Sequence, residues 1–174
     1  MKNAAFVPDV CPHCTQTTNY EMTLDRGTAL IVLAIANAVR RLGRNRVHVA
    51  DEMLAQHDGG RSFAEMVGAG YMTPKMYTNV SRARRHGLVA FAEGRGGGEY
   101  LLTRKGAAFL RGELVPRMAV VSKVTGHNSG YWPEGGTVRV GELLKRDAPM
   151  WAGAIRDSVE YLGGQPEEFT PAMV

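Results

Sequence analysis

The sequence has little of what extracellular and membrane proteins depend on. It contains only two cysteines, Cys11 and Cys14, in 174 residues, which is too few for a disulfide framework. No apolar run approaches the roughly 20 residues that a membrane-spanning helix needs. The first ten residues also lack the basic and apolar regions of a secretory signal. These absences predict a soluble, cytoplasmic protein with no membrane partner.

No arrangement of catalytic residues stands out either. The five histidines are scattered, and no serine, histidine and acidic residue forms a recognisable catalytic pattern. The glycine-rich run at 94–98 lies between two predicted strands, whereas a phosphate-binding loop follows a strand and opens a helix. We therefore expect this run to be a turn, and the protein not to be an enzyme.

Positive charge, in contrast, is concentrated in two segments of a chain whose net charge is +4. Residues 40–46 contain four arginines and no acid, and residues 73–112 contain eight basic and two acidic residues. The rest of the chain is acidic. This distribution predicts a footprint for a polyanion, and the alternative is an ordinary solvated surface.

Hydrophobic periodicity predicts helices in the first half of the chain. Apolar residues at four-residue steps from 31 to 39 place a stripe on a helix that ends at Gly43. A short strand at 46–49 follows. Ser62 and Glu65 match a capping box, which predicts the start of another short helix.

Thr73 and Pro74 predict a longer helix over residues 74–86. Met76, Val80 and Ala83 share one face of it, so they are expected to pack against the body. The opposite polar face carries Lys75, Thr78, Asn79, Arg82 and Arg85.

Two predicted strands, 88–91 and 100–103, surround the glycine-rich turn and form a hairpin. Residues 79–89 read Asn-Val-Ser-Arg-Ala-Arg-Arg-His-Gly-Leu-Val, and residues 100–106 read Tyr-Leu-Leu-Thr-Arg-Lys-Gly. They resemble MarR-like and PadR-like regulators, in which the recognition helix ends in Gly-Leu-Val and the second wing strand ends in Leu-Thr-x-x-Gly. The resemblance implies a winged helix-turn-helix.

We therefore predict an α+β fold in three parts. Residues 1–24 form a cysteine knuckle segment, 25–112 the winged helix-turn-helix, and 113–174 a small β/α appendage with a tail. The whole chain also resembles small phage or prophage proteins that join a cysteine knuckle to a winged helix.

The predicted function is sequence-selective binding of double-stranded DNA, as in a transcriptional regulator, by a homodimer with helix 74–86 in the major groove. Arg82 and Arg85 are the leading contacts, with Lys75, Thr78 and Asn79 nearer the helix N-terminus. The backbone contacts are expected from Arg95, Arg104 and Lys105. The alternative is a phage-type interaction protein that binds a host protein such as a polymerase or a defence component. The hairpin turn is only weakly basic, which favours this alternative.

The spacing of Cys11-Pro12-His13-Cys14 suits a zinc ion. Two ligands do not complete a tetrahedral site, so the others would come from a histidine or from the same pair in a second protomer. The histidines outside the motif are His48, His57, His86 and His127. A knuckle without metal is one alternative; a redox-active pair is another, but it lacks the strand and helix that frame such a site.

Overall fold

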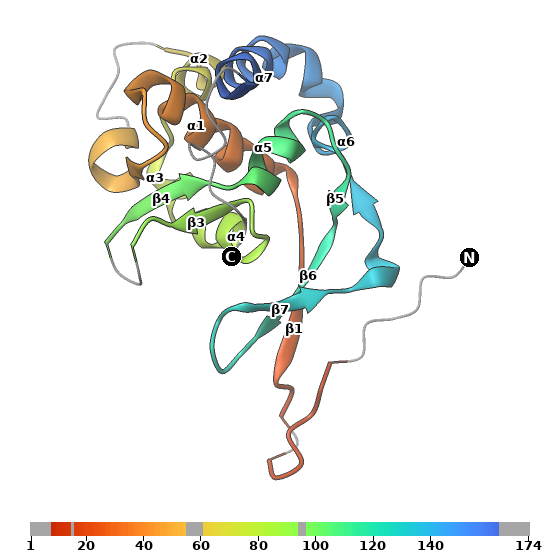
Figure 1. Ribbon diagram of the computed structural model, residues 1–174. Coiled ribbons are helices and arrows are strands. Elements are labelled where there is room, and N and C mark those ends of the chain that lie inside the picture. Colours follow the sequence, from red (N-terminus) through yellow and green to blue (C-terminus); the bar gives the residue numbers. More distant parts are fainter. Residues whose placement is uncertain (1–7, 15, 55–60, 94–96, 164–174) are drawn as a thin grey trace.

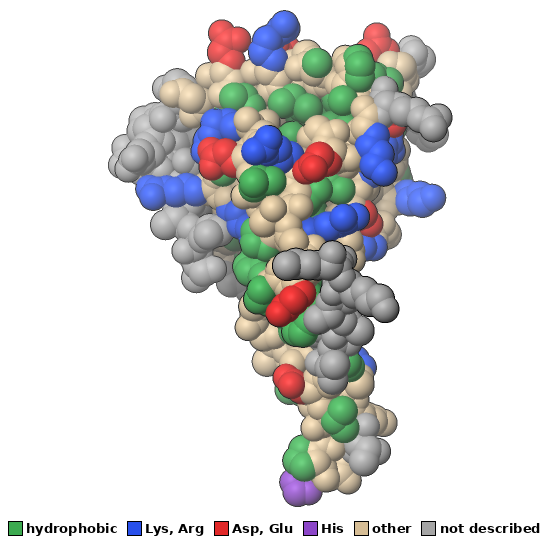
Figure 2. All heavy atoms as spheres, turned by 90° about the vertical axis from the view of Figure 1, so that its right-hand side faces the viewer, with side chains coloured by type: hydrophobic (Ala, Val, Ile, Leu, Met, Phe, Trp, Pro, Cys, Tyr) green, Lys and Arg blue, Asp and Glu red, His purple; other side chains and the backbone are tan. Residues whose placement is uncertain are grey.

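The computed structural model describes residues 8–14, 16–54, 61–93 and 97–163. Within them the chain is a mixed α+β protein, as predicted, with helices packed in a body and strands in three small antiparallel sheets. A narrow arm projects from the body, and its tip is formed by described residues between 8 and 18 (Figures 1 and 2). In the described part of the chain, no helix is long and apolar enough to cross a membrane.

Helix α1 (Arg26–Leu42) is the centre of the body. Asp25 caps its first turn by accepting the Thr28 N–H at 2.8 Å, and Gly43 ends it with a φ of 68°. All residues from Thr28 to Val39 are buried, so the predicted apolar stripe is one part of a helix that is covered all round. Its neighbours include α2 (Phe63–Gly68), α5 (Arg104–Leu110), α6 (Val140–Leu144) and α7 (Ala148–Gly163).

Helix α2 begins with the predicted capping box. Ser62 Oγ accepts the Glu65 N–H at 3.3 Å, and the Glu65 carboxylate accepts the Ser62 N–H at 2.7 Å. The ring of Phe63 meets the ring of Trp151 edge-on, with 5.8 Å between their centres. Trp151 is fully buried, so the C-terminal helix α7 returns to the body.

The helix predicted over residues 74–86 is in fact two short helices, α3 (Pro74–Tyr77) and α4 (Val80–Arg85). The break lies at Thr78 and Asn79, whose side chains both donate to the Lys75 carbonyl, at 2.8 and 3.2 Å. Side chains that bond to nearby backbone compete with the hydrogen bonds of a helix. This competition explains why the helix is interrupted.

The predicted hairpin is confirmed and forms a three-stranded antiparallel sheet in the order β2-β4-β3. Its strands are β2 (Val47–His48), β3 (Val89–Phe91) and β4 (Glu99–Leu102). The rings of Phe91 and Tyr100 lie side by side across the hairpin, with centres 5.2 Å apart. The short strand between α1 and α2 therefore extends the hairpin into a sheet.

The ends of the hairpin interlock with the start of α5. Thr103 Oγ1 donates to the Gly87 carbonyl at 2.6 Å and accepts the Gly106 N–H at 3.0 Å. A Cβ built on Gly106 would lie 2.1 Å from the Leu88 carbonyl oxygen. Position 106 therefore requires glycine, which gives a physical reason for the Thr-x-x-Gly spacing.

The arm is a second antiparallel sheet, in the order β1-β6-β7. It consists of β1 (Asn19–Thr23), β6 (Met118–Ser122) and β7 (Asn128–Tyr131). A two-stranded ribbon of β5 (Val115–Pro116) and β8 (Thr137–Val138) lies between the arm and α6. A strand from the first part of the chain thus shares one sheet with two strands that lie about 100 residues later.

Candidate nucleic-acid interface

The surface of α3 and of the turn after it carries three of the predicted contact residues. Lys75, Thr78 and Asn79 are all exposed, whereas Val80 and Ala83 are buried and α4 packs against α1. The apolar face therefore packs against the body, as predicted, and the α3 end of the polar face is open to solvent. An ammonium, a hydroxyl and an amide lie within one turn of chain.

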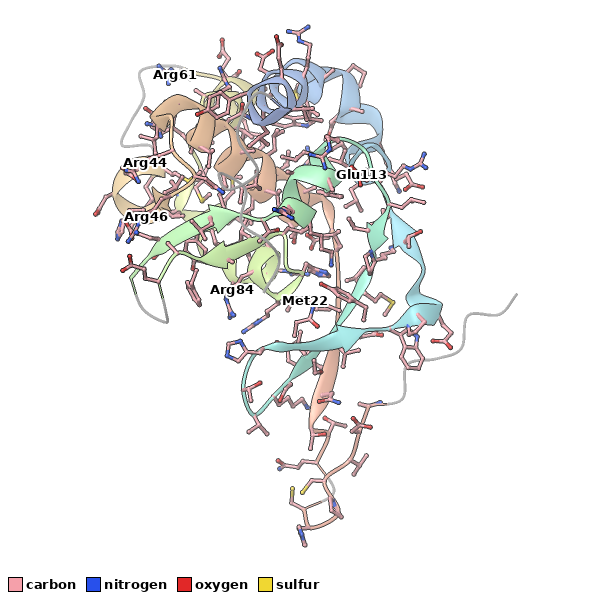
Figure 3. The ribbon with its side chains drawn as sticks, viewed as in Figure 1. Met22, Arg44, Arg46, Arg61, Arg84 and Glu113 are labelled. Atoms are coloured by element: carbon pink, nitrogen blue, oxygen red, sulfur yellow. The ribbon has the colours of Figure 1, made fainter. Side chains whose placement is uncertain are left out.

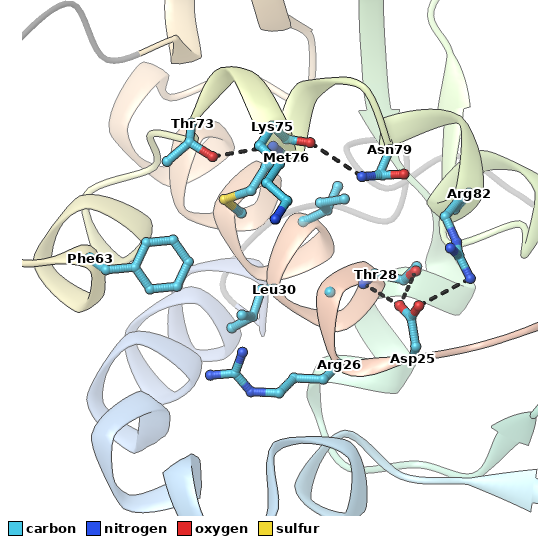
Figure 4. A pocket seen from close by; sticks show the side chains of 12 residues that line it. Asp25, Arg26, Thr28, Leu30, Phe63, Thr73, Lys75, Met76, Asn79 and Arg82 are labelled. Carbon is cyan, nitrogen blue, oxygen red and sulfur yellow. Dashed lines mark hydrogen bonds and ion pairs between the residues drawn. The ribbon is translucent and has the colours of Figure 1, made fainter.

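Arg82 is directed toward the start of α1 (Figure 4). Its Nη2 atom lies 3.0 Å from Asp25 Oδ2. Asp25 Oδ1 also accepts the Thr28 N–H at 2.8 Å and the Thr28 hydroxyl at 2.7 Å. Burial alone would raise the Asp25 pKa, but these hydrogen bonds and the charge of Arg82 lower it below its usual value. Arg82 is thus paired with a carboxylate that stays ionised.

Arg84 and Arg85 are half-buried near the end of α4. The Arg84 guanidinium lies 4.8 Å from the centre of the Phe91 ring and points toward the arm (Figure 3). The Arg85 carbonyl accepts a hydrogen bond from Asn128 Nδ2 of the arm at 2.7 Å. This end of α4 therefore lies between the hairpin and the arm.

The other three predicted cations occupy different environments. Arg104 is exposed at the start of α5, and Arg95 lies outside the described residues. Lys105 points inward, where Nζ donates to the His86 carbonyl at 3.0 Å and lies 3.7 Å from the centre of the Tyr131 ring. Burial lowers the Lys105 pKa to about 8. Lys105 therefore holds the end of α4, and Arg104 is the exposed member of the pair.

The arginines that end α1 bind to the body. The Arg40 guanidinium donates to the Gly68 carbonyl at 3.3 Å, and Arg41 donates to the Ala69 carbonyl at 3.2 Å. The Arg41 guanidinium also lies over the Tyr71 ring, 4.3 Å from its centre. These side chains tie α1 to the end of α2, where helix carbonyls lack partners within the helix.

Arg44 and Arg46 lie at the edge of the sheet, near β4 (Figure 3). Arg44 forms an ion pair with Glu52, and Arg46 forms ion pairs with Glu93 at 2.8 Å and Glu99 at 2.5 Å. Hydrogen bonds to Glu99 and Glu93 raise the Arg46 pKa. The positive field expected from residues 40–46 is thus largely neutralised here.

A groove of about 370 Å³ runs between the start of α1 and α3 (Figure 4). Its apolar lining includes Leu30, Ile31, Phe63 and Met76. The lining also includes three cationic side chains and one carboxylate: Arg26, Lys75, Arg82 and Asp25. Arg82 pairs with Asp25, and Arg26 pairs with Asp147 at 2.6 Å, so the charge of these two cations is largely balanced.

His86 is buried where α4, α5 and the arm meet. Burial, together with the charges of Lys105 and Arg82, lowers its pKa to about 4. Its backbone carbonyl accepts hydrogen bonds from Lys105 Nζ and from the Tyr131 hydroxyl, the latter at 2.9 Å. His86 is therefore a neutral residue at the junction of the body and the arm.

Cys11 and Cys14 lie at the tip of the arm, away from this surface. Of the histidines considered as further zinc ligands, His57 lies outside the described residues. His48 faces Asp51 at 3.0 Å, and His86 is buried in the body. Among the described residues, no group of three or more His, Cys, Asp or Glu side chains could hold a metal ion.

Two residues that shape this surface, Asp25 and Tyr131, were not predicted from the sequence. Asp25 could have been found as a helix cap, because it lies three residues before Thr28 at the start of an apolar helix. No pattern in the sequence indicates that Asp25 pairs with Arg82. The same is true of Tyr131, which reaches His86 from the arm.

Comparisons with protein-family models, with curated proteins and with solved structures found no match to this chain. Its function has to be inferred from the chemistry of its own surface.

Proposed function

We propose that the protein binds double-stranded DNA through a winged helix-turn-helix over residues 25–112 and acts as a transcriptional regulator. The order of helix, strand, helices and hairpin supports this proposal, as does the sheet order β2-β4-β3. So does the interlock of Gly87 and Leu88 with Thr103 and Gly106, since these residues carry the resemblance to MarR-like and PadR-like regulators.

The observation that carries the proposal is the exposed polar surface of α3 and its following turn. An amide such as that of Asn79 can pair with an adenine edge, and a lysine such as Lys75 with guanine or phosphate. The hairpin of β3 and β4, which follows α4 in the chain, is proposed to be the wing. We propose that this surface enters the major groove while Arg104, with Arg95, contacts the adjacent backbone.

Arg82 and Arg85 are proposed to complete the contacts from α4. The Arg82 and Asp25 side chains are 37% and 46% exposed, so their ion pair is a surface pair. Such pairs contribute only about 0–1 kcal/mol, so a phosphate or a guanine can replace Asp25 as the partner of Arg82. Lys105 is proposed to act indirectly, by holding the end of α4.

The test is a selection of bound sequences from randomised duplexes, with the full chain as bait. An enriched motif is expected, and the affinity for it should fall steeply with salt, because each neutralised phosphate adds about −0.9 to the log–log slope. A tight complex whose affinity does not change with salt would contradict the proposal. A motif with two half-sites would support binding as a homodimer.

The pairing of Arg44 and Arg46 with acidic residues favours a second candidate, a phage-type interaction protein that binds a host protein such as a polymerase or a defence component. These pairs leave the edge of the sheet nearly neutral. Phe63 and Tyr77 are also 42% and 38% exposed near α3. If selection yields no motif, this candidate becomes the better explanation.

A further inference from the structure

The tip of the arm is a tight hairpin that carries both cysteines. The Cys11 N–H donates to the Gln16 carbonyl at 2.8 Å, and the Thr18 N–H donates to the Asp9 carbonyl at 2.8 Å. These bonds hold Cys11 and Cys14 at the end of the arm, remote from the body (Figure 1). The cysteines contribute nothing to the hydrophobic core, so packing does not explain their presence.

The surroundings of the Cys11 sulfur suit a metal-bound thiolate. It accepts hydrogen bonds from the backbone N–H groups of Cys14 and His13, and the Cys14 side chain also interacts with it. Backbone donors around one sulfur suit a thiolate, which is the form of cysteine that binds a metal. No disulfide joins Cys11 and Cys14, so two thiol groups meet on one turn of chain.

Two sulfur ligands make half of a tetrahedral zinc site. Within the part of the chain that the structure describes, no third side chain joins them in a metal-binding group. Residues 1–7, which precede the hairpin, contain no His, Cys, Asp or Glu in the sequence. Cys14 is exposed, so the open half of the site faces solvent at the tip.

We propose that two copies of the protein meet at the tips of their arms and bind one zinc ion through Cys11 and Cys14 of each copy. Four cysteines form a closed structural zinc site. A two-fold axis through the ion makes the contact self-complementary, which is the usual geometry of a homodimer. Val10, 55% exposed next to Cys11, supplies an apolar side chain for the same contact.

This zinc bridge goes beyond the proposed function and does not depend on it. It can join two copies whether their bodies bind DNA or another protein. If the DNA proposal also holds, the bridge joins two recognition surfaces and limits the spacings of half-sites that one dimer can bind.

The test uses the full chain, purified with a reducing agent and without chelator. Zinc content and molar mass are measured on the same sample, by elemental analysis and light scattering. We expect about half a zinc ion per chain and the mass of a dimer, as two copies sharing one ion require. Chelation should yield monomers, and added zinc should restore the dimer. A monomer with one zinc ion, a dimer that survives chelation, or protein without zinc would each overturn the proposal.

Two variants separate the cysteines from the rest of the turn. Cys14→Ser should lose both zinc and the dimer while its circular dichroism spectrum stays that of the wild type, because Cys14 lies at the tip and outside the core. His13→Ala, a change on the same turn, should keep both. Zinc loss in His13→Ala would make the histidine a ligand and contradict the four-cysteine site. Replacing zinc with cobalt adds a second measurement. The charge-transfer absorption typical of a cobalt ion bound by four thiolates is expected. Absorption typical of only two thiolates would overturn the shared site.

Discussion

Arg82 Nη2 lies 3.0 Å from Asp25 Oδ2, so an arginine proposed to contact DNA is already paired with the cap of the central helix. The same carboxylate holds the Thr28 N–H and hydroxyl. One residue therefore both stabilises the start of α1 and restrains the proposed recognition surface, and the two roles can be separated by mutation.

Asp25→Asn is expected to strengthen DNA binding several-fold. Asparagine caps a helix about as well as aspartate, so α1 keeps its cap while Arg82 loses its counter-charge. A released arginine that contacts a phosphate should steepen the log–log salt slope by about 0.9. Asp157→Asn makes the same change of charge on α7, where Asp157 pairs with Arg156, and should have little effect. Equal affinities for both variants in a duplex titration would exclude Arg82 as a contact.

Lys75→Gln is expected to weaken binding to all duplexes alike if Lys75 contacts a phosphate, because a phosphate contact carries no sequence information. Asn79→Ala should instead reduce the preference for the selected motif, with a loss of about 1–3 kcal/mol if its amide contacts a base edge. The Lys75 side chain is exposed, so the melting temperature of Lys75→Gln should stay the same. Asn79→Ala also removes the hydrogen bond to the Lys75 carbonyl, so its fold is checked by circular dichroism. Lys123→Gln, on the exposed turn of the arm, serves as the control. Normal binding by folded Lys75→Gln and Asn79→Ala proteins would remove α3 from the interface.

Gly106→Ala is expected to destabilise the protein by about 1–3 kcal/mol or more, the range typical of overpacked sites. The added methyl group would lie 2.1 Å from the Leu88 carbonyl oxygen, and backbone at that distance has to move. Gly153→Ala in α7 has open space around the new methyl group and should be neutral or stabilising. Urea unfolding of both variants measures the difference. A Gly106→Ala protein as stable as the wild type would show that this contact is not tight.

Stability is expected to fall as the pH decreases from about 6.5 toward 4. Burial keeps His86 neutral in the folded protein and lowers its pKa to about 4, from an ordinary value of 6.5. The unfolded chain therefore takes up the proton first, and the stabilisation is complete above pH 6.5 and lost across this window. The loss is on the order of 3 kcal/mol. His86→Leu should flatten the pH dependence of the free energy of unfolding, measured with urea. His127→Gln, a change at an exposed position, should leave that pH dependence as in the wild type. If His86→Leu shows the wild-type pH dependence, another group causes the loss of stability.

Local chemistry explains most of what the sequence could predict about the fold. Ser62 and Glu65 signalled the start of α2, and Thr73 and Pro74 signalled α3, because caps act over three or four residues. The interruption after α3 was predictable by the same logic, since Thr78 is a residue type that bonds to nearby backbone. Thr78 lies within a clear helical pattern of apolar residues, so a continuous helix was predicted instead.

Contacts between distant segments could not be predicted in this way. Strand β1 pairs with β6 across nearly 100 residues of sequence, with Asn19 opposite Ser122, and alternation within either strand does not name its partner. For the proposed site, the sequence predicted which side chains of α3 are exposed. It did not predict that Lys105 points inward, because the direction of this side chain depends on contacts with His86 and with Tyr131 of the arm.

The last turn of α4 depends on residues that are synthesised much later. The Arg85 carbonyl is bonded by Asn128, and the His86 carbonyl by Tyr131. During translation α4 is therefore made before the residues whose side chains bond to its end. In the full chain we expect Asn128→Ala to speed the exchange of amide hydrogens at the end of α4, so that the order of the surface proposed to bind DNA depends on the arm.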